Sequence, residues 1–314
     1  MKLGKSLLFV LLASLSANSA NAELNILSTI KPIYYLVEGV NQGINPHKLM
    51  VSFSVSPHDY QPKPSDIRKI KNSDVIFRIH ENFQPRLNKL LSANAANIPT
   101  FSLANLKPIR LLANEAHLNI EHQEDAHNMD EDHDEHGHNH DHGAYDLHIW
   151  LSPINAIILT QEIALQLSKL DKDNTVKYQY NAEQQISNLR KLDLSLQQKL
   201  APLKNRNFFS YHDAYGYFTE NFGLNHSIAV TPSQSHQLSA KKMQDILDLS
   251  EDKSITCVML EPQFNDKISK IIVKKNPKTK VNSWDPLGFD LELEANSYYT
   301  LIKNMADKLT TCLS

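Results

Sequence analysis

A long helical repeat in the middle of the chain is the feature that most constrains its fold. Apolar residues recur there at steps of four and three, at Tyr178, Ala182, Ile186, Leu189, Leu192, Leu196 and Leu200. This spacing predicts one unbroken helix over 174–202, begun by an Asp/Asn-rich cap and stopped at Pro202. At 1.5 Å per residue, a helix of about 28 residues is roughly 40 Å long. It is long enough to span two lobes like a strut.

Short apolar runs alternate with amphipathic stretches on both sides of this helix. That alternation is typical of buried strands followed by helices. The predicted strands cover 24–30, 48–54, 74–79 and 99–103 before it, and 206–212, 226–230, 254–261 and 279–285 after it. The predicted helices include 84–94, 154–170, 239–252 and 298–313. We therefore expect an α/β fold of two similar lobes, over 23–173 and 203–314, each with a central sheet flanked by helices.

The first 22 residues have the pattern of an export signal peptide. Lys2 and Lys5 precede an apolar stretch over 7–15, and the sequence Ala-Asn-Ala at 20–22 is a small-residue cleavage site. No later segment approaches the 18 uncharged apolar residues of a membrane span. No cysteine lies near the cleavage site to carry a lipid. The sequence predicts a protein of the bacterial periplasm without a membrane anchor.

The chain has only two cysteines, Cys257 and Cys312. In an oxidising compartment such a pair predicts one disulfide bond. That bond would tie the C-terminal helix to an internal strand. Two buried free thiols are the alternative, and a zinc site on two distant cysteines is favoured less than either.

One segment, at 115–143, departs from the α/β alternation. No Lys or Arg occurs between Arg110 and Lys169, while acids and histidines crowd this segment and no apolar face recurs. We expect a disordered insertion. Its histidines are His117, His122, His127, His133, His136, His138, His140 and His142. The basic residues elsewhere are scattered and form no patch interleaved with aromatics, so nucleic-acid binding is not expected.

Four other residues stand where a predicted strand gives way to a loop: His58, His148, His212 and Asp285. Ligands of open α/β sheets gather outside the carboxyl ends of the strands. Three imidazoles and one carboxylate form a tetrahedral shell suited to Zn²⁺. Each residue alone is weak support, because a single histidine at a strand end is more often structural.

The segments around these residues resemble the solute-binding proteins of zinc and manganese ABC importers, and specifically the periplasmic zinc-binding subunit. The matching motifs, in order, are PHDYQPKPSD, DLHIWLSP, YHDAYGYF and WDPLG, with CVMLEPQF as a further family segment. The resemblance covers essentially the whole mature chain. It implies two α/β lobes joined by one long helix, with the metal in the cleft between them. It also implies delivery of Zn²⁺ to an inner-membrane permease and its ATPase by a monomeric protein.

In one position the chain departs from the zinc-binding relatives. Some of them have a glutamate directly before the first histidine, where this chain has Pro57. Either Asp285 or a water molecule must then complete the shell, and we expect Asp285 because an oxygen ligand is otherwise missing. Glu261 is expected to support the site rather than bind the ion.

The histidine-rich segment is expected to bind several ions weakly and to release them readily. Ordering a flexible chain around each ion costs roughly 1–2 kcal/mol per residue fixed, and a preorganised site avoids most of that cost. The segment would then collect or sense zinc near the tight site. A solvated spacer without a metal role is the alternative.

Three other functions are alternatives to zinc delivery. A manganese-binding homologue would tend to replace one imidazole with a carboxylate, because Mn²⁺ prefers harder ligands. A periplasmic metal buffer would use the histidine-rich segment as its main store. An exported zinc hydrolase is the least favoured, because neither an H-E-x-x-H motif nor a nucleophile elbow occurs in the sequence.

Overall fold

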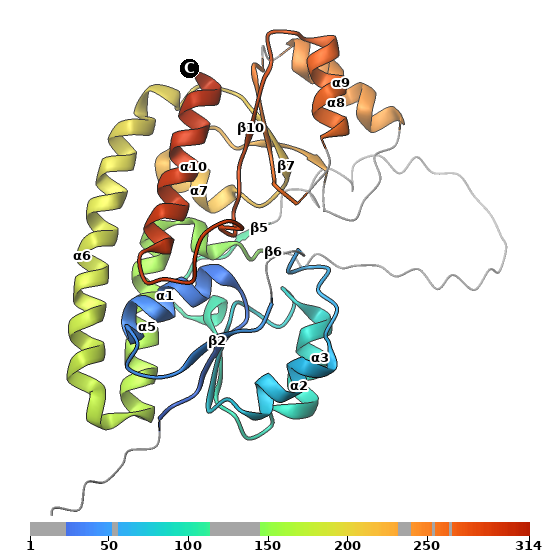
Figure 1. Cartoon of the computed structure of the whole chain (residues 1–314). Helices are drawn as coiled ribbons and strands as arrows, with labels where there is room; N and C mark the ends of the chain where they lie inside the picture. Colours follow the sequence, from blue (N-terminus) through green and yellow to red (C-terminus); the bar gives the residue numbers. More distant parts are fainter. Residues whose placement is uncertain (1–22, 52–55, 114–144, 232–239, 253–254, 264–265) are drawn as a thin grey trace, which may run out of the picture.

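The computed structural model describes residues 23–51, 56–113, 145–231, 240–252, 255–263 and 266–314. The expected signal peptide and the expected disordered insertion, with all eight of its histidines, lie outside these ranges. Two four-stranded parallel sheets form the framework, one from each half of the chain (Figure 1). This architecture confirms the α/β prediction.

The first sheet has the order β2-β1-β3-β4 and the second has the order β10-β9-β7-β8. Counted from its own first strand, each sheet therefore has the order 2-1-3-4, so the two halves share one topology. The strands are β1 (Ile26–Ser28), β2 (His47–Leu49), β3 (Val75–Arg78), β4 (Thr100–Ser102), β7 (Phe209–His212), β8 (Ile228–Thr231), β9 (Cys257–Leu260) and β10 (Lys280–Ser283). All eight lie within or beside the predicted runs.

Helices cover the sheets and connect their parallel strands. In the first half these are α1 (Lys31–Asn41), α2 (Pro64–Lys71) and α3 (Pro85–Asn94). In the second half they are α7 (Gly216–Phe222), α8 (Ala240–Asp252), α9 (Lys267–Lys275) and α10 (Ser297–Leu313). A proline in the first turn starts each of α1, α2 and α3, where its fixed φ suits a helix and its missing N–H has no partner to lose.

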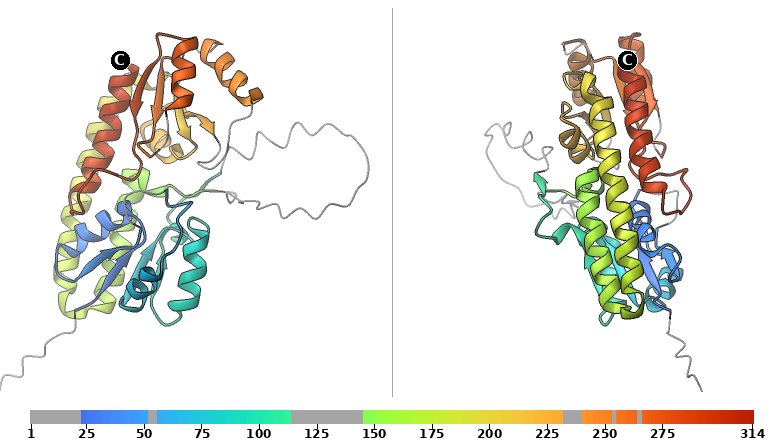
Figure 2. Two further views of the ribbon diagram at one scale, coloured as in Figure 1. Left: turned by 45° about the vertical axis from the view of Figure 1, so that its right-hand side comes forward. Right: turned by 90° about the vertical axis from the view of Figure 1, so that its left-hand side faces the viewer.

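Two long helices follow the first sheet: α5 (Pro153–Leu170), which ends the first half, and α6 (Thr175–Leu200). Helix α6 has 26 residues, and it contacts α1 and α5 from the first half and α7 and α10 from the second. Figure 2 shows it running beside both sheets. The predicted strut is therefore confirmed, within two residues at each end.

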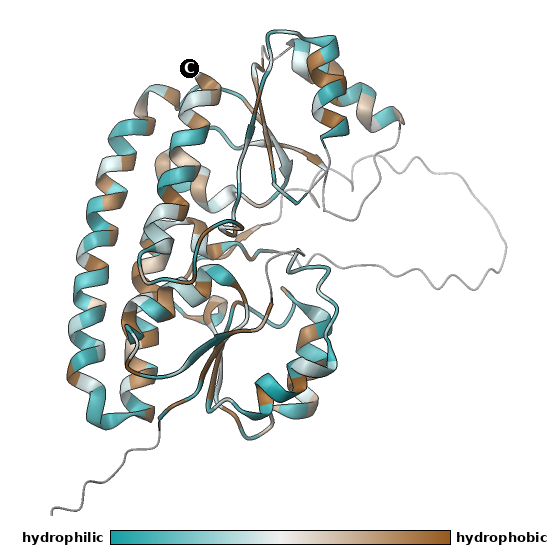
Figure 3. Cartoon of the chain, viewed as in Figure 1, coloured by the Kyte–Doolittle hydropathy of each residue, from teal (hydrophilic) through white to brown (hydrophobic). Residues whose placement is uncertain are grey.

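The buried face of α6 follows the predicted stripe and adds polar members to it. Figure 3 shows α6 as mostly hydrophilic with separated hydrophobic positions. Tyr178, Leu189 and Leu200 have no exposed surface. Asn181 and Gln185 are also buried, and their side-chain amides donate to the backbone carbonyls of Val40 and Leu36 on α1. Side chains that bond to a neighbouring helix can thus replace apolar ones on a buried face.

One hydrophobic cluster runs through both halves. It joins Val37 of α1 and Trp150 of the first half to Phe218 and Leu309 of the second. The shared core does not mark a boundary between the halves, so the division at residues 173 and 202 stays a prediction. Within the second half, Cys257 on β9 and Cys312 on α10 form the predicted disulfide.

A short antiparallel pair, β5 (Leu112–Ala113) with β6 (Tyr145–Asp146), lies between the two sheets. This pair flanks the histidine-rich segment in sequence and was not predicted. Among the described helices, none combines the length and the apolar character that crossing a membrane requires.

Candidate metal centre

Three of the four predicted ligands lie together in the structure. His58 comes from the connection after β2, His148 directly precedes a 3-10 turn, η2 (Ile149–Leu151), and His212 is the last residue of β7. Their ligating nitrogens lie within 4.8 Å of one another. In the described ranges no other group of three His, Cys, Asp or Glu side chains meets that limit.

The spacing of the imidazoles suits a tetrahedral ion. The Nε2 atoms of His58 and His148 are 3.2 Å apart. Two ligands of a tetrahedral Zn²⁺ with Zn–N near 2.0–2.1 Å are separated by roughly 3.3 Å. The ring centroid of His212 lies 6.2 Å from that of His58 and 5.4 Å from that of His148. Small side-chain movements would bring the three nitrogens to one ion.

The ring of His148 is oriented by Asp146, two residues earlier. The Nδ1 atom of His148 lies 2.7 Å from Oδ1 of Asp146, and the backbone N–H of His148 donates to the same oxygen at 2.8 Å. A carboxylate on Nδ1 fixes the tautomer in which Nε2 carries the lone pair that can bind a metal. Burial raises the pKa of Asp146 to about 8, against the bond from His148 that lowers it.

The ring of His212 is oriented in the same way by Glu261. His212 ends β7 and Glu261 directly follows β9, its neighbour in the sheet, so the two residues face each other at the carboxyl ends of paired strands. The Nδ1 atom of His212 is hydrogen-bonded to Oε1 of Glu261, and both side chains are buried. This arrangement confirms the expectation that Glu261 supports the site.

The other nitrogen of His212 has no hydrogen-bond partner among the described residues. Its Nε2 atom is buried, 4% of the residue being exposed. Buried polar atoms are nearly always paired in folded proteins, so an unpaired one needs an explanation. A metal ion shared with His58 and His148 would supply the missing partner.

Charge around His212 favours a cation. Burial lowers the pKa of His212, but the carboxylates of Glu261, Asp213 and Asp146 outweigh it and the pKa is raised. The same field that holds a proton on the imidazole also attracts a divalent ion. Protons and metal therefore compete for this site.

Phe83 supports the two remaining imidazoles. Its ring, which is 2% exposed, packs edge-on at 4.5 Å from His58 and 5.6 Å from His148, measured between centroids. Sequence reasoning did not find Phe83 or Asp146. The sequence did indicate where to look for both, because Phe83 follows the predicted strand at 74–79 and Asp146 lies two residues before the proposed ligand His148.

The structure does not bring Asp285 to the three imidazoles. Its carboxylate belongs to no ligand group with them. It accepts the backbone N–H of Leu287 at 2.9 Å, of Gly288 at 3.0 Å and of Phe289. A carboxylate satisfied by three backbone donors is a poor candidate for a fourth ligand in this arrangement. The choice between Asp285 and water for the fourth position stays a prediction.

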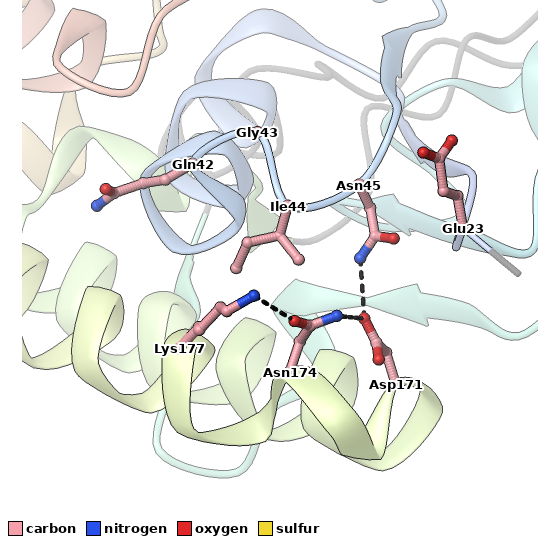
Figure 4. A pocket seen from close by; sticks show the side chains of 8 residues that line it. All are labelled: Glu23, Gln42, Gly43, Ile44, Asn45, Asp171, Asn174 and Lys177. Carbon is pink, nitrogen blue, oxygen red and sulfur yellow. Dashed lines mark hydrogen bonds between the residues drawn. The ribbon is translucent and has the colours of Figure 1, made fainter. Parts of the chain in front are cut away.

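A polar cavity of about 490 Å³ lies at the opposite edge of the first sheet. Glu23 and Asn45, which line it, precede β1 and β2 and so mark the amino ends of the strands. Figure 4 shows Asn45 and Asn174 donating to Asp171, and Lys177 donating to Asn174. Four of its lining residues are thus bonded to one another, and we assign the cavity no chemistry.

Comparison with known proteins agrees with this site. The family profile described as ZnuA, zinc-uptake complex component A periplasmic, matches residues 26–312. The high-affinity zinc uptake system protein ZnuA of Brucella suis biovar 1 (strain 1330) is 33% identical over 306 residues, covering 92% of this chain and 91% of that protein. The protein of the same description from Yersinia pestis is 28% identical over 311 residues, covering 96% and 95%.

A solved structure shares the fold over almost the whole chain. The crystal structure of ZnuA has a TM-score of 0.76 and 26% sequence identity, covering 93% of this chain and 100% of that one. A ZnuA deletion mutant with zinc bound has a TM-score of 0.74 and also 26% identity, covering 93% and 99%.

Proposed function

The chain belongs to the family of periplasmic zinc-uptake complex components A, and on that premise we propose that His58, His148 and His212 hold the transported Zn²⁺ through their Nε2 atoms. The protein captures zinc with high affinity for import by an ABC transporter. The observation that carries the choice of residues is the buried Nε2 atom of His212, which lies beside two further imidazoles and has no hydrogen-bond partner in the described part of the chain.

The donor set supports zinc over manganese. Three neutral imidazoles are borderline ligands that suit Zn²⁺, whereas Mn²⁺ needs harder oxygen ligands to compete. Neither Asp146 nor Glu261 is placed to serve as one, because each bonds to the Nδ1 face of its histidine. We assign the fourth position to a water molecule, since Asp285 is engaged elsewhere.

The site is built for binding rather than for catalysis. The family is one of solute-binding proteins. A zinc hydrolase also needs a general base beside the metal-bound water. Asp146 and Glu261 are bonded to the Nδ1 atoms of two imidazoles, so neither is available as a general base. We therefore propose delivery without chemical conversion of the ion.

The cellular setting follows the family. We propose that the mature protein is a periplasmic monomer without a membrane anchor, which passes Zn²⁺ to an inner-membrane permease driven by its own ATPase. The signal-like first 22 residues and the descriptions of the relatives support this setting. The histidines of the segment 115–143 would collect ions weakly beside the tight site.

Zinc titration of the mature protein in competition with a chelator tests the proposal. Replacing His58, His148 and His212 together with Asn should abolish tight binding, while the matched variant His80→Asn should bind like the wild type. Submicromolar affinity in the triple variant would overturn the assignment. Deleting residues 121–141 should leave the tight ion in place and remove weakly bound ions, and loss of the tight ion would instead favour a metal buffer.

A further inference from the structure

A loop of the second half, residues 285–291, crosses to the first half and is held there by a buried lysine. We call this loop the strap. The Nζ atom of Lys31, at the start of α1, donates to the carbonyl oxygens of Gly288, Phe289 and Leu291, each at 2.8 Å. Only 6% of Lys31 is exposed. An ammonium group has three N–H donors, and here three carbonyls from the other half of the chain face it.

Asp285 shapes the strap from inside. Its carboxylate accepts N–H bonds from Leu287, Gly288 and Phe289, so it closes the turn that presents carbonyls to Lys31. Its negative charge also lies near enough to Lys31 to raise the pKa of the ammonium, against the burial that lowers it to about 8. In this structure Asp285 therefore shapes a contact between the halves.

Gly288 lets the strap lie against α1. Its φ is +71°, a left-handed conformation that favours glycine. A Cβ atom at this position would lie 3.0 Å from the hydroxyl oxygen of Tyr35 and 3.0 Å from the side chain of Leu291. That hydroxyl donates to the carbonyl of Gly288 at 3.1 Å. Both the turn and the close approach to α1 therefore require glycine.

The strap also reaches the metal centre through Trp150. The indole Nε1 of Trp150 donates to the carbonyl of Pro286 at 2.8 Å. Trp150 lies two residues after His148, and the two rings are 5.2 Å apart between centroids. The strap thus contacts α1 and also Trp150, whose ring lies near that of the proposed ligand His148.

We propose that the strap sets the distance between the two halves of the metal centre, with Lys31 and Asp285 as its positioning residues. His58 and His148 come from the first half and His212 from the second, so the three can share an ion only when the halves keep one separation. Helix α6 and the shared hydrophobic cluster also join the halves, and the strap adds polar contacts that reach Trp150, whose ring lies near that of His148. The inference rests on the proposed three-histidine site.

Distance measurements between the halves test this directly. Spin labels on cysteines introduced at the exposed Lys89 and Lys270 can be attached selectively, because both native cysteines form a disulfide. We expect a narrow distance distribution in the metal-free protein, and a broad one in Lys31→Met that narrows again with zinc. The exposed Lys48 supplies the control Lys48→Met, which should match the wild type. An unchanged distribution in Lys31→Met would overturn the proposal.

Zinc affinity and the visible spectrum of bound Co²⁺ together distinguish a positioning residue from a metal ligand. Lys31→Met and Asp285→Asn should each weaken zinc binding about 10-fold, the loss expected when only about a tenth of the molecules keep the binding-competent separation. The visible spectrum of bound Co²⁺ should keep the wild-type shape in both variants, because the ligands are unchanged. A changed Co²⁺ spectrum in Asp285→Asn would make Asp285 a ligand and would overturn its assignment here.

The conservative variant Tyr35→Phe covers the case in which Lys31→Met fails to fold. It removes the hydroxyl that donates to the carbonyls of Gly288 and Leu291 and keeps the packing of the ring. We therefore expect a smaller loss of zinc affinity, and a smaller broadening of the distance distribution, than in Lys31→Met. Unchanged values for both would contradict the proposal. Failure of the three-histidine site would look different, because the triple histidine variant would then keep tight binding while the distance distributions still responded to Lys31→Met.

Discussion

Replacing Glu261 with glutamine tests how much the negative charge behind the proposed ligand His212 contributes to zinc binding. Glu261 does not contact the expected position of the ion; it bonds to Nδ1 of His212 and also accepts from the amide of Gln263 at 2.8 Å. Glutamine has nearly the same volume and keeps an oxygen acceptor for the imidazole N–H. The variant therefore removes the negative charge while the packing stays close to that of the wild type.

The magnitude follows from the position of that charge. A carboxylate roughly 6–7 Å from a divalent cation, at an effective dielectric constant near 20, attracts it by about 5 kcal/mol. This is an upper bound, because the same carboxylate also stabilises the proton that competes with zinc. Loss of such supporting groups typically weakens metal binding by about 10–100-fold, which corresponds to about 1.4–2.7 kcal/mol. We expect Glu261→Gln to fall in that range.

The assay is zinc affinity at pH 7.5 by chelator competition, with unfolding in urea measured on the same samples. Glu183 on the exposed face of α6 supplies the matched control Glu183→Gln, which should bind zinc as the wild type does. A Glu261→Gln protein that is folded and binds within twofold of the wild type would refute the role given to Glu261. An equal loss in the control would show that net charge, and not this contact, is responsible.

Three further predictions concern stability, each measured by urea unfolding. Replacing Cys257 and Cys312 with Ser should lower the free energy of unfolding by about 4 kcal/mol, because the disulfide closes a 55-residue separation; a loss below about 1 kcal/mol would contradict this. Leu189→Ala, fully buried on α6, should cost about 2–5 kcal/mol, whereas Leu194→Ala, 62% exposed, should cost less than about 0.5 kcal/mol, and similar losses in the two would contradict the packing of α6. Burial lowers the pKa of His47, although its bond to Glu38 opposes this, so the unfolded chain takes up the proton first and stability falls as the pH drops below about 6.5. His47→Gln should flatten that fall, and an unchanged slope between about pH 7.5 and pH 5 would refute it.

The fold was predictable because its determinants are local. Parallel strands with both faces buried are continuous apolar runs, as in β3 and β9, where the side chains of Val75, Phe77 and Val258 are fully buried. Periodicity likewise located α6 to within two residues. The polar residues inside its buried face, such as Gln185, were not predictable, because their partners come from α1.

Of the predicted ligands, the three histidines meet, but only His212 ends a strand of a parallel sheet. His58 lies in the connection after β2 and His148 lies two residues after β6, so sheet geometry accounts for one of the three positions. The role of Asp285 was not accessible from sequence. The sequence around a carboxylate that follows a strand is the same whether the carboxylate faces an ion or its own turn. Here its role depends on Lys31, which lies 257 positions from Gly288. Contacts over such a separation leave no local pattern.

The most direct test of the central claim is a crystal structure of the mature protein loaded with one equivalent of zinc, with anomalous scattering recorded at the zinc edge. We expect one strong peak at roughly 2.0–2.1 Å from Nε2 of His58, His148 and His212, with a water as the fourth ligand. A principal peak on any other set of side chains would contradict the account.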